Sequence, residues 1–264
     1  MREKIAVAGG TGLIGRMVVD AVRAAGRQPV VLARSTGVDL LTGAGLPESL
    51  DGVDAVIDVI NIATQRRRRA VEFFGSATTA LVRAQERAGV RHHVTLSIVG
   101  IDRVDTGYYA GKLRHEEVVT RGQVPWTILR STQFHEFAGM LLDLLPGPVA
   151  VVPIQLSRPV AAREVAQHLV ELATGPASGR APEIAGPQEC RMADLVRRLA
   201  RARHSRRAVL ELPALGVATT AAARGALLPN GSGPRGTETF DQWLIRTGGR
   251  PHPTVPEQAM GQAS

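Results

Sequence analysis

The sequence predicts an α/β fold: a doubly wound parallel sheet with helices on both faces and a small C-terminal lobe. Three observations lead to this prediction. Short apolar segments alternate with amphipathic segments of helical length, an order typical of βαβ units with right-handed crossovers. The first apolar segment runs directly into a glycine-rich turn, Gly9-Gly10-Thr11-Gly12. Of the 264 residues, 44% are hydrophobic and 21% are charged, which is ordinary for a chain with a buried core.

The first half of the chain supplies most of the expected sheet. Apolar segments bounded by glycine or polar residues predict strands at residues 5–8, 29–33, 55–59, 93–97 and 126–129, with a further short strand near Val38. Helical periodicity predicts helices at about 13–25, 70–88 and 108–121, each followed by a glycine. Residues 1–132 are therefore expected to form the core that contains the parallel sheet.

The second half of the chain is less regular. It predicts helices at 134–144, 163–173, 192–203 and 238–246, and strands at 149–154 and near 183–185. Residues 133–252 are expected to form a substrate-binding lobe interleaved with the core, and residues 253–264 a disordered tail. The apolar stretches are short or interrupted by proline, so no membrane span is expected.

The chain is basic, with 32 Lys and Arg against 24 Asp and Glu and a net charge of +8. Its densest basic run, residues 66–69, is expected to be the solvated start of a helix. Aromatic residues make up only 3% of the chain, too few for base stacking, so nucleic-acid binding is not expected. The one cysteine, Cys190, excludes an intramolecular disulfide, and no Cys/His spacing suggests a metal site. The expected compartment is the cytoplasm.

The turn after the first strand has the spacing of a dinucleotide-binding loop. Gly10, Gly12 and Gly15 form the pattern G-x-G-x-x-G between a predicted strand and a predicted helix. Glycine permits a tight turn, close approach of the backbone to a pyrophosphate and close helix packing, while the N–H groups of the helix start attract phosphate charge. The sequence thus predicts a Rossmann-type fold. The expected cofactor contacts in the turn are Gly9, Gly10, Thr11, Gly12, Leu13, Ile14 and Gly15.

The end of the second predicted strand favours NADP over NAD. An NAD-binding protein usually has Asp or Glu there to accept hydrogen bonds from the ribose hydroxyls. This chain has Arg34 and Ser35 instead, a guanidinium and a hydroxyl suited to a 2′-phosphate. The missing carboxylate is the stronger part of the argument in a chain so rich in arginine. Asp39 is placed to meet the adenine, although a capping role in its own loop would explain it equally well.

Both tyrosines of the chain and one of its two lysines lie within five residues. Tyr108 and Lys112 are four residues apart at the start of a predicted helix, so they share one face. A nearby ammonium favours the phenolate and lowers the phenol pKa, which suits the pair for proton transfer. Arginine is not an equivalent replacement, because its planar guanidinium has a different shape. Tyr109 is the competing candidate, and we expect it to pack or to line the pocket.

The glycine turn and Tyr108-x-x-x-Lys112 together resemble the short-chain dehydrogenase/reductase superfamily. More narrowly, residues 96–102, 108–112 and 124–135 are similar to atypical members with an NmrA-like NAD(P)H-binding domain, and the resemblance covers about residues 3–190. It implies that Ser97 hydrogen-bonds a substrate carbonyl and that Lys112 also contacts the cofactor ribose.

Two further positions match the family less closely. Asn61 matches a family asparagine in part and is expected near the cofactor. Residues 130–134 depart from the family's Arg-Pro, which leaves the cofactor contacts there open. His135 either faces the substrate or packs beside the neighbouring phenylalanines.

The resemblance implies an NADPH-dependent oxidoreductase that reduces a carbonyl or conjugated carbonyl (ketone, enone or quinone), with Tyr108 as proton donor. The protein is expected to be a monomer or a homodimer. Two alternatives remain. One is a non-catalytic NmrA-like NAD(P) sensor, a class that typically lacks an intact Tyr-x-x-x-Lys pair. The other is an epimerase or isomerase, and epimerases tend to have a larger C-terminal lobe. A hydrophobic substrate is favoured by the apolar residues Pro213, Leu215, Val217, Leu227 and Leu228.

Overall fold

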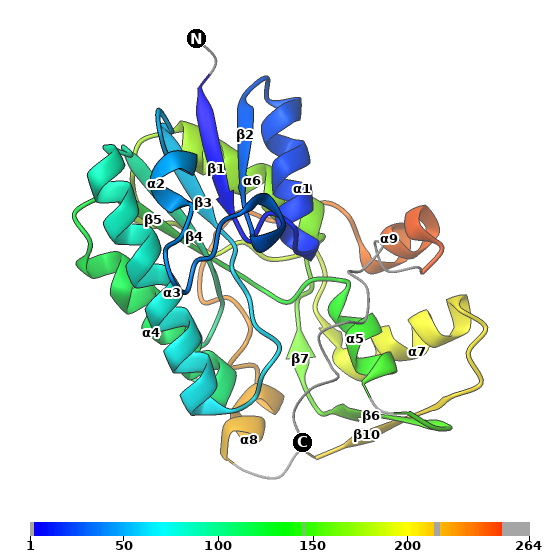
Figure 1. Ribbon diagram of the computed structural model, residues 1–264. Coiled ribbons are helices and arrows are strands. Elements are labelled where there is room, and N and C mark those ends of the chain that lie inside the picture. The colour runs from blue at the N-terminus through cyan, green and yellow to red at the C-terminus, as the bar shows by residue number, and fades with distance from the viewer. Residues whose placement is uncertain (1–2, 145, 214–216, 250–264) are drawn as a thin grey trace.

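The computed structural model describes residues 3–144, 146–213 and 217–249 (Figure 1). Leu215 and the tail expected at 253–264 lie outside these residues. Figure 1 shows a sheet flanked by helices, with a smaller group of elements beside it that includes α5, α7, β6 and β10. This is the α/β architecture that the sequence predicts.

The main sheet of the described chain has six parallel strands in the order β2-β1-β3-β4-β5-β8. They are β1 (Lys4–Ala8), β2 (Gln28–Leu32), β3 (Ala55–Asp58), β4 (His92–Ile98), β5 (Trp126–Ser131) and β8 (Gly179–Arg180). Strand β1 pairs with β2 on one side and with β3 on the other, so the direction of winding reverses at β1. In open α/β sheets, ligands bind at such a switch point, beyond the carboxyl ends of the strands.

Helices cover both faces of this sheet (Figure 1). On one face, α1 (Leu13–Ala24) and α6 (Ala162–Thr174) bury their apolar sides against β1, β3 and β4. On the other face lie α3 (Arg67–Ala88) and α4 (Gly107–Arg121). No described helix has both the length and the apolar composition needed to cross a membrane.

Helices α3 and α4 cross closely at Gly111. A Cβ atom at this position would lie 2.7 Å from the Cβ of Ala70 and 2.8 Å from Cδ2 of Phe74, so a larger residue would push the helices apart. The next residue, Lys112, is 4% exposed and places its Nζ 4.8 Å from the centre of the Phe74 ring. The glycine thus sets the depth at which Lys112 is buried.

The structure differs from the predictions at two strands. No strand forms near Val38, because after β2 the chain makes one turn of 3-10 helix, η1 (Arg34–Thr36), and a loop that leads to α2 (Leu46–Ser49). Glycines with positive φ recur in this segment and interrupt extended backbone. The strand expected near residues 183–185 is reduced to isolated bridges, and β8 forms the sheet edge instead. The arginine run is the exposed start of α3, as predicted.

The smaller group of elements has its own core, which includes Leu199, Phe240 and Trp243. Its helices and strands are α5 (Phe137–Asp143), α7 (Met192–Ala202), α9 (Phe240–Thr247) and the parallel pair β6 (Val149–Pro153) and β10 (Ala208–Leu212). A short antiparallel pair, β7 (Leu156–Ser157) and β9 (Cys190–Arg191), and helix α8 (Val217–Ala223) complete the described elements. Because α6 and β8 join the main sheet, sheet segments and lobe segments alternate along the second half of the chain.

Candidate functional site

The glycine turn between β1 and α1 is built so closely that side chains do not fit. Gly9 has a φ of 79°, and the N–H of Gly12 donates to the Gly9 carbonyl oxygen at 2.9 Å. A Cβ atom on Gly15 would overlap that same carbonyl oxygen. Helix α1 therefore begins in direct contact with the turn, as the spacing of the glycines predicts.

The start of α1 offers backbone donors to an anion. Gly12 is the N-cap residue, no side chain caps the helix, and its first turn contains no acidic residue. The first N–H groups of a helix have no acceptor within the helix, and the helix dipole adds positive potential there. Uncapped donors in a glycine-rich turn fit the pyrophosphate of a dinucleotide.

Arg34 and Ser35 lie directly beyond the carboxyl end of β2, and both are exposed. The N–H of Gly9 donates to the carbonyl oxygen of Leu32 at 3.2 Å, so this end of β2 adjoins the glycine turn. Both side chains are thus available to a ligand bound at the turn. Asp39 differs, because its Oδ1 accepts the N–H of Leu41 at 2.8 Å and caps its own loop. The capping alternative accounts for Asp39 without a ligand.

Tyr108 and Asn61 are brought together by the fold. The Tyr108 hydroxyl donates to Oδ1 of Asn61 at 2.6 Å, and the half-buried ring packs edge-to-face on Phe74 with centroids 5.9 Å apart. Asn61 follows Ile60, whose Cα lies 3.1 Å from the position of a Cβ added to Gly9. Tyr108, Asn61 and the glycine turn therefore lie along the same edge of the sheet.

The expectation that Lys112 lowers the pKa of Tyr108 is wrong. Burial raises the pKa of Tyr108 above its usual value, and the neighbouring Tyr109 adds to the rise. The Lys112 ammonium is directed into the sheet, where Nζ donates to the carbonyl oxygen of Leu96 at 2.8 Å. The Tyr108 phenol consequently remains protonated at neutral pH.

Lys112 belongs to a buried polar group. Besides Leu96, its Nζ contacts Nδ1 of His115 at 2.9 Å. Burial lowers the pKa of Lys112 to about 8, although the carboxylates of Asp58 and Glu116 oppose this shift. An ammonium has three N–H donors. The third has no acceptor among the described residues, and the side chain is only 4% exposed.

Ser97 lies next to an ion-pair cluster. It is 1% exposed, and its Oγ makes no hydrogen bond of normal geometry with the described residues, yet it is close enough to Glu116 to help lower the pKa of that carboxyl. Glu116 is held by Arg130 at 2.9 Å and by Arg180 at 2.8 Å. The hydroxyl is thus free to donate but faces no open space, and its expected contact with a substrate carbonyl stays a prediction.

Tyr109 and His135 have different surroundings. Tyr109 packs against a small apolar cluster that includes Val104 and Leu227, between α4 and the chain that follows α8. His135 is buried in the core of the lobe, with Nε2 at 3.1 Å from the carbonyl oxygen of Glu238 and its ring edge-to-face with Phe240. Tyr109 therefore matches the expected packing role, and so does His135.

Sequence reasoning missed two residues of the site, Asp58 and His115. Both are fully buried, and Nε2 of His115 lies 2.8 Å from Oδ2 of Asp58. Two signals pointed to them: Asp58 is the only charged residue of an otherwise apolar strand, and His115 follows Lys112 by one helical turn. A carboxylate in a buried strand needs a partner, and this partner lies far away in the sequence.

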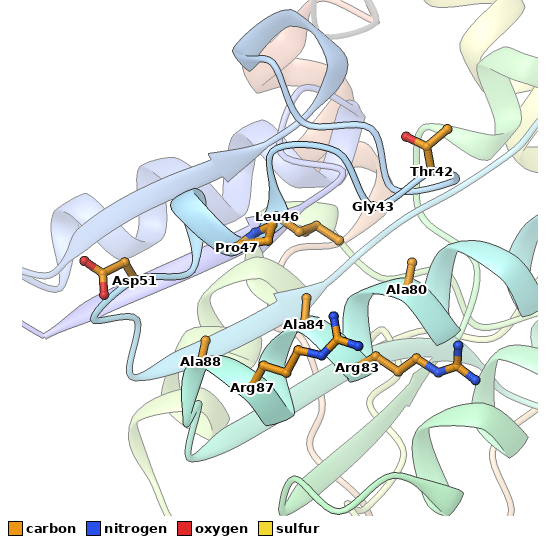
Figure 2. A pocket seen from close by; sticks show the side chains of 10 residues that line it. All are labelled: Thr42, Gly43, Leu46, Pro47, Asp51, Ala80, Arg83, Ala84, Arg87 and Ala88. Carbon is orange, nitrogen blue, oxygen red and sulfur yellow. The ribbon is translucent and has the colours of Figure 1, made fainter.

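A hollow of about 480 Å³ lies away from these residues, between the loop before α2 and helix α3 (Figure 2). Figure 2 shows Arg83 and Arg87 on the α3 side and Asp51 at the opposite end. None of the residues predicted to bind the cofactor lines it. The dinucleotide site is assigned to the glycine turn on backbone geometry, and the hollow is not part of it.

Comparison with known proteins shows the family and the fold of the chain. Residues 33–176 match the family described as NAD(P)H-binding, a range that begins after the glycine turn. No curated protein matches the chain. Similar solved structures include a short-chain dehydrogenase/reductase superfamily protein from Agrobacterium tumefaciens with bound NAD. It is 20% identical, the match covers 93% of this chain and 96% of that chain, and the TM-score is 0.68.

Two epimerases have similar folds. The UDP-N-acetylglucosamine 4-epimerase from Bacillus cereus is 17% identical, with 96% of this chain and 99% of that chain covered and a TM-score of 0.68. The UDP-glucose-4-epimerase from Stenotrophomonas maltophila with bound NAD is 15% identical, with 93% and 97% covered and a TM-score of 0.69. Since this chain spans nearly the whole of both, the expectation that epimerases need a larger lobe no longer separates them from this protein.

Proposed function

The chain belongs to the NAD(P)H-binding family, and on this basis we propose that it is an atypical, NmrA-like short-chain dehydrogenase/reductase that works as an NADPH-dependent oxidoreductase. Its reaction is the reduction of a carbonyl or conjugated carbonyl in a small hydrophobic molecule. The observation that carries the proposal is the protonated Tyr108 hydroxyl, held by Asn61 beside the glycine turn, with the Lys112 ammonium one helical turn away.

The residues of the site fit a nicotinamide dinucleotide. The uncapped start of α1 and the glycine turn would hold its pyrophosphate, and the free N–H of Lys112 would reach its ribose. When bound, the cofactor supplies a hydride to the carbonyl carbon.

In this reaction Tyr108 gives its hydroxyl proton to the carbonyl oxygen, which becomes the hydroxyl of an alcohol. Because burial raises its pKa, the Tyr108 phenol is protonated at neutral pH and is in the form that can donate a proton. Reduction of a carbonyl requires this form. Ser97, with its unpaired hydroxyl, would orient the carbonyl oxygen once a substrate is bound.

The preference for NADPH rests on Arg34 and Ser35. Both side chains are exposed beside the glycine turn, and no carboxylate stands at the end of β2. A 2′-phosphate next to a guanidinium gains charge-assisted hydrogen bonds that a ribose hydroxyl does not provide. Two of the similar solved structures contain NAD, so the contacts proposed for Arg34 and Ser35 are the point to test.

The substrate is proposed to be hydrophobic. Tyr109 adjoins Tyr108, and it packs with Val104 and Leu227 in an apolar cluster on the side of the site that faces the C-terminal segment. We further propose that the protein acts in the cytoplasm, since its single cysteine requires no oxidising compartment, and that it acts as a monomer or homodimer.

The test is NADPH oxidation by wild-type and Tyr108→Phe protein against a panel of ketones, enones and quinones. Removal of the phenolic proton donor should lower turnover by about 10²–10⁴-fold while NADPH still binds. Tyr109→Phe is the matched control, and its turnover should stay within about threefold of wild type, as expected for a tyrosine that packs. Unchanged turnover in the Tyr108→Phe protein would contradict the role of the phenol.

An epimerase is the second candidate, favoured by the full-length match to the Bacillus cereus enzyme. Such an enzyme would interconvert sugar nucleotides without net consumption of the dinucleotide. Incubation with UDP-sugars, followed by chromatography of the products, separates the two functions. Tight binding of NADPH with neither reaction would instead indicate the non-catalytic sensor.

A further inference from the structure

A chain of buried polar contacts runs from α4 to the end of β3. Nζ of Lys112 contacts Nδ1 of His115 at 2.9 Å, and Nε2 of His115 contacts Oδ2 of Asp58 at 2.8 Å. The other carboxylate oxygen of Asp58 accepts the N–H of Ile60 at 3.0 Å. All three side chains are at most 4% exposed, so the chain is closed to solvent along its length.

We infer that Asp58 and His115 are positioning residues, which hold the Lys112 ammonium in its charged form and fix the orientation of its N–H donors. This inference rests on the proposed function, because it takes Lys112 to belong to the site of that reaction. Neither residue touches Tyr108, and each acts on the site only through Lys112.

The contacts fix the proton arrangement of His115. A carboxylate can only accept hydrogen bonds, so Nε2 of His115 carries the ring proton and donates it to Asp58. Nδ1 is then unprotonated and accepts a hydrogen bond from Lys112. Burial and the adjacent Lys112 ammonium both lower the pKa of His115, which keeps the ring neutral. A neutral ring in this tautomer is an acceptor for the lysine.

Other contacts restrict where the ammonium can point. The Phe74 ring stacks on His115 with centroids 5.3 Å apart and planes 21° apart, and it also lies 4.8 Å from Nζ. The Leu96 carbonyl takes a second N–H of Lys112. With two donors engaged and an aromatic ring on one side, the third N–H has a fixed direction before any ligand arrives. A preorganised donor needs no reorientation when the ligand binds.

The charged and titratable groups around Lys112 come from three elements. Asp58 on β3 and Glu116 on α4 favour its charged form, while His115 on α4 is neutral. His93 on β4 faces Asp58 at 3.9 Å and is kept neutral by burial. Helix α3 contributes uncharged groups, Phe74 and Gln85. Glu116 is already paired with Arg130 and Arg180, so Asp58 is the carboxylate assigned to Lys112 through His115.

The test uses the fact that the chain has only two lysines, Lys4 and Lys112. In full-length protein labelled with ¹⁵N-lysine, two side-chain Nζ signals are expected, and Lys4→Arg assigns them. Asp58→Asn removes the charge but keeps a side chain of the same size. It should shift the Lys112 titration to lower pH by about half a unit or more, because an opposite charge is lost. The Lys4 signal is the internal reference.

Glu117→Gln is the matched control, since it removes a carboxylate from the next position of α4, where the side chain is 41% exposed and paired with Arg114. It should leave the Lys112 titration unchanged. His115→Leu removes the acceptor and should speed the exchange of the Nζ protons with water. His115→Gln, whose amide can both accept and donate, should restore slow exchange.

The outcomes separate this inference from the proposed function. If Lys112 titrates at the same pH in the Asp58→Asn and Glu117→Gln proteins, the positioning role is overturned. This holds whatever the turnover assays show. If Lys112 responds as expected but Tyr108→Phe retains full turnover, the positioning of Lys112 stands and the proposed reductase chemistry fails. Failure of His115→Gln to restore slow exchange also counts against the inference.

Discussion

The Tyr108 hydroxyl donates a hydrogen bond to Oδ1 of Asn61. The same oxygen accepts a hydrogen bond from the N–H of Ile62 at 2.8 Å. The contact between Tyr108 and Asn61 ties the first turn of α4 to the loop that follows β3, two segments separated by 47 positions in the sequence. The contact with the Ile62 backbone fixes the orientation of the Asn61 side chain, and Asn61 in turn fixes the orientation of the Tyr108 hydroxyl. The orientation of the proposed proton donor is therefore set by a loop of the nucleotide-binding sheet.

Asn61→Ala should lower turnover about fivefold, because loss of one hydrogen bond of this kind costs about 1 kcal/mol and frees the phenol to rotate. NADPH affinity should change much less. Steady-state NADPH oxidation and fluorescence titration measure the two effects. Asn230→Ala, which removes an exposed asparagine bonded to Arg103, is the control. Equal losses of turnover in the Asn61→Ala and Asn230→Ala proteins would argue against a specific role for Asn61.

Gly15→Ala should abolish dinucleotide binding, because the new methyl group overlaps the Gly9 carbonyl oxygen and displaces α1 from the turn. Overpacking of this kind typically costs about 1–3 kcal/mol of stability. Urea unfolding and NADPH fluorescence titration measure both quantities. Gly231→Ala places its methyl group in open space and should behave as wild type. Normal binding by the Gly15→Ala protein would remove the turn from the cofactor site.

Arg34→Ala should weaken NADPH binding about tenfold or more, since hydrogen bonds to a charged group contribute about 1.5–3 kcal/mol. NADH lacks the 2′-phosphate and should bind with nearly unchanged affinity. Titration of both cofactors gives the ratio. Arg83→Ala on α3 is the control for lost surface charge. If the affinities for NADH and NADPH fall by the same factor, Arg34 does not bind the 2′-phosphate.

His93→Gln should make the protein less sensitive to mild acid. Burial lowers the pKa of His93 to about 4 from its usual 6.5, against the attraction of Asp58. Between these two values the unfolded chain binds a proton that the folded chain excludes, so stability is complete above pH 6.5 and declines as the pH falls towards 4. One such group contributes about 3 kcal/mol over this range.

Urea unfolding of wild type and His93→Gln at several pH values between 4 and 7 measures this difference. The variant should show the shallower loss of stability. His168→Gln on α6, where the histidine pairs with Glu171 near the surface, is the control. Identical acid profiles for wild type and His93→Gln would mean that His93 is not the group that titrates.

Much of the fold follows from local patterns in the sequence. The strands β1, β3, β4 and β5 and the helices α1, α3, α4 and α6 are strongly periodic and end at glycines or polar residues, and their predicted bounds lie within a few residues of those observed. The glycine turn is equally local, because its chemistry depends on residues that are neighbours in the chain. The strand expected near Val38 failed because several glycines with positive φ follow it.

The site was less predictable, because its contacts are long-range. The spacing of Tyr108 and Lys112 correctly placed them on one helix, but a helical wheel does not show how deeply a side chain is buried. Close packing at Gly111 carries Lys112 into the sheet, towards Asp58, and leaves the pKa of Tyr108 to be raised by burial. Asp58 and His115 are 57 positions apart, and the two local signals, a charge in an apolar strand and a histidine one turn after Lys112, do not show that the two residues meet.

Helix α6 covers one face of the main sheet, and strand β8 forms its edge. Both come after the first segment of the lobe in the sequence. A fragment ending at residue 132 would leave the edge of β5 unpaired and the apolar side of α1 uncovered. Replacing the whole chain after residue 132 would therefore also remove part of the main sheet and its cover. The lobe consists of two separate segments, one before Val160 and one after Gly186, and a graft that preserves the sheet has to keep the segment between them.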